Sequence, residues 1–73
     1  MRPRAQIVCA AVIEDLTHAG EPLRMRDMTR ARAAASCPRE LHVVLVRMLR
    51  KGELTRSGAG YHQGDRFRYD LPA

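Results

Sequence analysis

Arginine is the residue type in this chain best suited to contacting another molecule. Twelve of its 73 residues are arginine, against a single lysine. Arg56, Arg66 and Arg68 flank a glycine-containing segment, and Arg39 and Arg47 stand upstream of it. A guanidinium donates paired hydrogen bonds to a phosphate or to a guanine edge, which an ammonium cannot do. The arginines therefore point to a phosphate-bearing partner, although the codon usage of a GC-rich genome explains their excess equally well.

Other residues with reactive side chains do not form a recognisable site. Cys9 and Cys37 are the only cysteines, and they lack the partners and spacing of a zinc site. Two free thiols are expected, with a disulfide as the alternative. Glu14 and Asp15 are adjacent and diverge around a helix, so they form a poor acid–base pair. No nucleophile elbow, phosphate-binding loop or dinucleotide fingerprint is present, and the sequence predicts neither an enzyme nor a cofactor.

Length and charge narrow the class of protein. Seventy-three residues suffice for one domain, which we place at 1–73, and a chain this short buries only about 60% of its unfolded surface. The net charge of +5 and the isoelectric point near 10.2 favour binding to phosphate polymers. No apolar run is long enough to cross a membrane and no signal peptide is evident. We expect a cytoplasmic, nucleoid-associated bacterial protein without a membrane partner.

Apolar residues at helical spacing predict three helices. The first, at about 5–18, has Val8, Val12 and Leu16 on one face with Cys9 and Ile13 beside them.

A second helix is expected at about 26–34, starting near Arg26 or Asp27, after a short extended piece at Leu23–Met25. The third is expected at about 37–51, with Ser36 as its N-cap and Gly52 after its end. Its inward residues are expected to be Leu41, Val44, Leu45 and Met48, with Leu49 at the edge of the same face.

The end of the chain alternates between apolar and polar residues, which is typical of strands. We expect a β-hairpin at about 53–71, in which Leu54 points inward on the first strand. On the returning strand Phe67, Tyr69 and Leu71 share one face. The expected fold class is therefore α+β and mostly α, with three helices and a C-terminal hairpin.

Five short motifs follow one another along the chain: Val12-Ile13-x-x-Leu16, Glu21-Pro22-Leu23, Leu45-x-x-Met48-x-x-x-Gly52, Leu54-x-Arg56 and Phe67-x-Tyr69-x-Leu71. In this order, from about residue 5 to residue 72, the sequence resembles the winged helix-turn-helix family of DNA-binding domains. The resemblance implies that the third helix lies in the major groove and that the hairpin, the wing, touches a neighbouring backbone or minor groove.

Residue roles follow from the same resemblance. Outward residues at the start of the third helix would read bases, and Arg47 would touch phosphate. The arginines of the hairpin would serve the wing, and His62 at its tip would touch the backbone. The implied DNA-binding residues are Arg39, Glu40, His42, Val43, Arg47, Arg56, His62, Arg66 and Arg68.

Arg39 is singled out independently by its place in the first helical turn. The helix macrodipole disfavours a positive charge there by roughly a few tenths of a kcal/mol. A position that breaks a local rule without a folding benefit is often functional, and here it could meet a phosphate or a guanine. The alternative is that Glu40 simply offsets the charge on a solvated surface.

The expected function is that of a small DNA-binding protein that regulates transcription, and a phage or plasmid is one origin that such a protein would fit. An architectural protein resembling the short basic excisionases is a variant of this hypothesis. The partner would be double-stranded DNA, and a homodimer or a larger protein assembly remains open. A rival hypothesis is a winged-helix adaptor that binds only protein, through Val43 and Val46 on the exposed side of the third helix.

Overall fold

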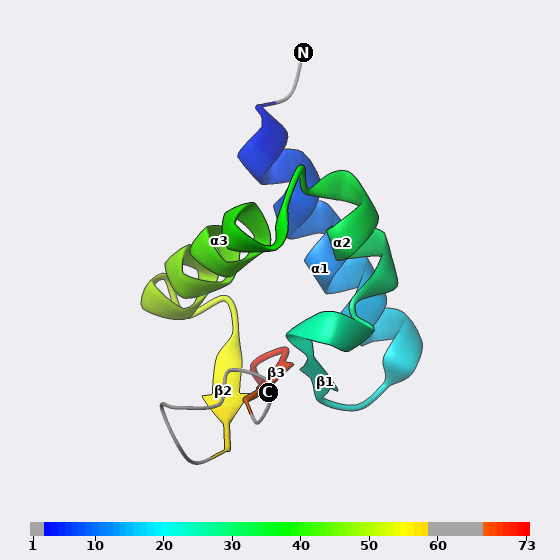
Figure 1. Ribbon diagram of the computed structural model, residues 1–73. Helices are drawn as coiled ribbons and strands as arrows, with labels where there is room; N and C mark the ends of the chain where they lie inside the picture. Colours follow the sequence, from blue (N-terminus) through cyan, green and yellow to red (C-terminus); the bar gives the residue numbers. More distant parts are fainter. Residues whose placement is uncertain (1–2, 59–66) are drawn as a thin grey trace.

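Helices form most of the molecule, and a small antiparallel sheet lies at one end of them (Figure 1). A computed structural model describes residues 3–58 and 67–73, so His62 and Arg66 lie outside the described residues. The predicted α+β class with three helices is confirmed. The elements are α1 (Arg4–Ala19), β1 (Leu23–Arg24), the 3-10 helix η1 (Met25–Asp27), α2 (Thr29–Ala34), α3 (Pro38–Arg50), β2 (Thr55–Ser57) and β3 (Arg68–Asp70).

The first helix, α1, forms the back of the helical layer in Figure 1 and supplies Val8, Val12 and Leu16 to the core. It ends at Gly20, whose φ of 66° is left-handed and whose N–H donates to the Leu16 carbonyl at 3.0 Å. Cys9 packs against the core as expected. The expectation for Ile13 is wrong, because 42% of its surface is exposed. One residue advances about 100° around a helix, which carries Ile13 off the buried face that Val12 occupies.

The second helix starts later than the sequence predicts. α2 begins at Thr29, and the residues before it form η1. Asp15, a buried residue of α1, accepts hydrogen bonds from the backbone N–H groups of Arg30 at 3.2 Å and Ala31 at 2.9 Å. These amides belong to the first turn of α2 and have no partner within the helix. Because the carboxylate that caps them comes from 15 residues upstream, no local signal marks this start.

The third helix ends as predicted but begins one residue away from the expected cap. Cys37, not Ser36, is the N-cap, and Pro38 occupies the first helical turn. Ser36 instead donates its backbone N–H to Oε1 of Glu40 at 2.8 Å. At the other end Gly52 has a φ of 75°, and its N–H donates to the Leu49 carbonyl at 3.1 Å. This bond belongs to a Schellman turn, which directs the chain into the sheet.

The sheet has three strands in the order β1–β3–β2, all antiparallel to their neighbours. The predicted hairpin corresponds to β2 and β3, and the extended piece at Leu23–Arg24 adds a third strand on the far side of β3. Tyr69 is buried, while Phe67 and Leu71 are half-buried against the core, so the predicted apolar face is confirmed. The residues that form the core are Val8, Val12, Leu16, Met28, Ala31, Leu41, Val44, Leu45, Met48, Leu54 and Tyr69.

Candidate nucleic-acid interface

The side of α3 that faces away from the core is the first part of the candidate interface. Four predicted inward residues are confirmed as buried, namely Leu41, Val44, Leu45 and Met48. At 3.6 residues per turn, the opposite side carries Arg39, Val43 and Arg50, which follow one another at intervals of four and seven residues. All three are exposed, and Val43 exposes 46% of its surface.

Arg50 was not among the site residues that the sequence indicated. Its spacing of eleven residues from Arg39 is a near-integral three turns, so both arginines lie on one line along α3, about 16 Å apart. His42 and Arg47 are exposed on the two flanks of this line. In the described part of the chain, no side chain of these four residues takes part in an ion pair or hydrogen bond. The helix therefore presents uncommitted donors.

Glu40 occupies a different environment from its predicted neighbours. It is half-buried, and its Oε1 accepts the Ser36 N–H while its Oε2 lies 3.7 Å from Nη1 of Arg4 in α1. Both carboxylate oxygens are thus engaged at the junction of α1 and α3. This arrangement neutralises the only acidic residue of α3, and leaves the positive charge of its exposed side without an internal counterion.

The sheet carries Arg56 and Arg68, the two described residues among those predicted for the wing. The guanidinium carbon of Arg56 lies 4.3 Å from the centre of the Phe67 ring, a distance at which cation and ring attract each other. Phe67 is half-buried against the core, so it forms a fixed platform for an exposed arginine. Arg68 is also exposed and is paired with Ser57 of β2 and Arg24 of β1.

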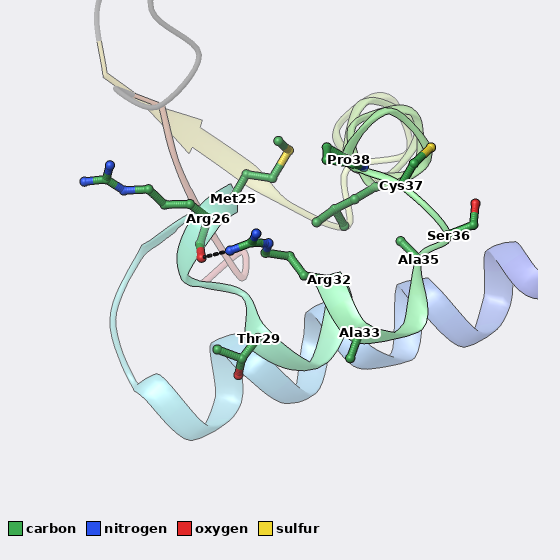
Figure 2. Close-up of a pocket in the computed structure, with 10 residues that line it drawn as sticks. Met25, Arg26, Thr29, Arg32, Ala33, Ala35, Ser36, Cys37 and Pro38 are labelled. Atoms are coloured by element: carbon green, nitrogen blue, oxygen red, sulfur yellow. Dashed lines mark hydrogen bonds between the residues drawn. The ribbon is translucent and has the colours of Figure 1, made fainter.

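A groove that the sequence did not predict lies between α2 and the start of α3 (Figure 2). Its volume is about 580 Å³, and Nη1 of Arg32 donates across it to the Arg26 carbonyl at 2.9 Å. The lining residues contribute two arginines and no carboxylate. They are Met25, Arg26, Thr29, Arg32, Ala33, Ala35, Ser36, Cys37, Pro38 and Leu41.

The cysteines and carboxylates do not suggest a second kind of site. Among the residues that the structure describes, no group of three or more metal-ligating side chains comes together. Both thiols are free, Cys9 half-buried and Cys37 exposed. Burial raises the pKa of the Cys9 thiol, and the negative charge of Glu53 adds to the effect. No helix in the described ranges has the length and apolar character needed to cross a membrane.

Comparison of the chain with protein-family models, with curated proteins and with solved structures gave no match.

Proposed function

We propose that this protein is a winged-helix domain that binds double-stranded DNA and regulates transcription. The exposed side of α3 carries the proposal, because it presents Arg39, Val43 and Arg50 in line. The one carboxylate of the helix, that of Glu40, is already engaged by Ser36 and Arg4. The order of three helices followed by an antiparallel hairpin supports it, because the hairpin begins directly beyond the end of α3.

In the proposed complex α3 lies in the major groove. Arg39 and His42 would donate hydrogen bonds to base edges, and the apolar Val43 would contact a thymine methyl group. Arg47 and Arg50 would bind phosphates, since they lie farther along the helix. Glu40 would act mainly by holding the start of α3 against α1, because both its oxygens already have partners.

The wing would add contacts from the sheet. Arg56 is the best placed of its described residues, because its stacking on Phe67 limits the freedom that binding would otherwise remove. A guanidinium held in this way can bind a phosphate with a smaller loss of side-chain entropy. His62 and Arg66 remain predicted wing contacts.

Titration of labelled duplex DNA at several salt concentrations tests the proposal. Each phosphate contact contributes about −0.9 to the slope of log affinity against log salt. Four exposed arginines, Arg47, Arg50, Arg56 and Arg68, would give a slope of about −3.6 if each bound one phosphate. Absence of binding at low salt, or an affinity independent of salt, would contradict the proposal.

The exposed Val43 favours a second candidate, a protein-binding adaptor. Val43 and the half-buried Val46 are apolar residues on the side of α3 that faces away from the core, and such residues often mark a protein contact. The two candidates differ for Val43→Arg. On DNA this change adds a cation and should preserve or raise non-specific affinity, whereas in a protein interface it should abolish binding.

A further inference from the structure

Two arginines lie directly opposite each other on adjacent strands of the sheet. Arg24 of β1 is paired with Arg68 of β3, and Arg68 is paired in turn with Ser57 of β2. Directly opposed residues of antiparallel strands point to the same side of the sheet, with their Cβ atoms about 4.5–5.5 Å apart. The adjacent Tyr69 is buried in the core, so Arg24 and Arg68 project from the outer side.

Such a pair disfavours folding, because like charges directly opposite each other destabilise a sheet. Arg24 is half-buried, which further reduces the screening of its charge by water. Within residues 3–58 and 67–73 neither Arg24 nor Arg68 takes part in an ion pair. The sheet therefore contains a pair of like charges that does not stabilise the fold.

A cavity of about 430 Å³ lies beside the pair, and both arginines line it. Glu21 and Asp27 also border this cavity, yet neither is in an ion pair with the arginines. The space is more than ten times the volume of about 30 Å³ that one water occupies in the liquid, so it can hold a phosphate group. Two arginine side chains that line such a space can supply the charged donors that a phosphate requires.

We propose that Arg24 and Arg68 together bind one phosphate of the DNA backbone, outside the contacts made by α3. This inference rests on the proposed DNA binding. A phosphate between the two guanidinium groups replaces their repulsion with charge-assisted hydrogen bonds, and Ser57 stands next in the same row. Because β1 is the strand farthest from β2, the footprint on DNA extends across the full width of the sheet.

The first arm of the test uses inorganic phosphate, with ionic strength held constant by potassium chloride. The arginine Nε–H signals are followed by NMR in the wild type, in Arg24→Gln and in Arg68→Gln. Lys51→Gln is the matched control, since it removes one exposed positive charge from the end of α3. Phosphate should shift the Arg24 and Arg68 signals and raise the melting temperature of the wild type and the control only. Unmoved signals, or equal stabilisation of all variants, would overturn the proposal.

The second arm uses duplex DNA. In the double variant Arg24→Gln/Arg68→Gln, the salt slope should become shallower by about 0.9, the value for one phosphate. Between about 50 and about 200 mM salt, its affinity should then fall about 3.5-fold less than that of the wild type, while Lys51→Gln should match the wild type. An unchanged slope would overturn the assignment to the DNA backbone. If even the wild type binds no duplex, the proposed function fails, and the phosphate arm alone decides whether the pair is an anion site.

Discussion

Arginine has opposite surroundings at two places in the molecule. Where α1 meets α2, Arg30 donates to a buried carboxylate, Asp15, which also accepts two backbone N–H groups. On the exposed side of α3, neither Arg39 nor Arg50 takes part in an ion pair in the described chain. The arginine between α1 and α2 is therefore paired with a carboxylate, whereas the arginines on the exposed side of α3 form no ion pair in the ranges that the structure describes. The contrast separates arginines that serve folding from those available for a partner.

Removal of the Asp15 carboxylate should have the largest effect on stability. Asp15→Ala deletes the acceptor of three hydrogen bonds and leaves the first turn of α2 without its cap. We expect a loss of about 3 kcal/mol in the free energy of unfolding, since bonds to a charged group contribute about 1.5–3 kcal/mol each and do not add fully. Urea denaturation followed by circular dichroism measures it.

Glu14→Ala is the matched control for this prediction. Glu14 is the neighbouring acidic residue on α1, but it is exposed and has no ion pair in the described chain. Its replacement should change stability by less than about 0.5 kcal/mol. Equal losses in the two variants would show that Asp15 acts only through its charge, and the distinction between the two regions would lose its basis.

Substitution of an arginine on the exposed side of α3 should lower the affinity for DNA and leave the stability of the fold unchanged or slightly higher. Arg39→Gln should lower the affinity for a preferred duplex about tenfold, about 1.4 kcal/mol, and should weaken the discrimination between sequences. Stability should stay the same or rise by roughly a few tenths of a kcal/mol, because a positive charge leaves the first turn of α3. Competition titrations with several duplexes measure the first effect and thermal melting the second. A clear loss of stability would instead assign Arg39 to the fold.

The buried face of α3 could be predicted from the sequence, whereas the start of α2 could not. Leu41, Val44, Leu45 and Met48 were identified correctly because helical periodicity is a local property of the chain. The start of α2 was missed because its cap, Asp15, comes from another helix. Periodicity does not report such long-range partners.

Site residues were predictable to a smaller degree. The exposure of Arg39, His42, Val43 and Arg47 followed from the same periodicity, and Arg50 could have been added by extending the spacing by three turns. The opposition of Arg24 and Arg68 depends on strand register between segments more than forty residues apart, which alternation alone cannot fix.

Substitution of Glu40 shows whether this residue stabilises the fold, as Asp15 does, or contacts DNA, as is proposed for Arg39. Glu40 was predicted to read bases, yet its carboxylate holds the start of α3 through Ser36 and Arg4. Glu40→Ala should cost about 1 kcal/mol of stability, because one hydrogen bond and a partly exposed ion pair are lost. The preference among duplexes should be unchanged. A shift in sequence preference at wild-type stability would place Glu40 with the DNA-contacting residues.

The smallest effect is expected at Arg56, which shares features of both regions: its charge is uncompensated, yet its side chain is held by Phe67. Arg56→Lys keeps the charge and loses the planar stacking, so stability should fall by about 0.5 kcal/mol. Phe67→Leu alone also disturbs the core, and a double-mutant cycle is needed to isolate the pair. A coupling energy of about 0.5 kcal/mol would show that the ring holds the guanidinium. A coupling of zero would show that Arg56 is as free as Arg39, and its advantage as a pre-ordered phosphate contact would disappear.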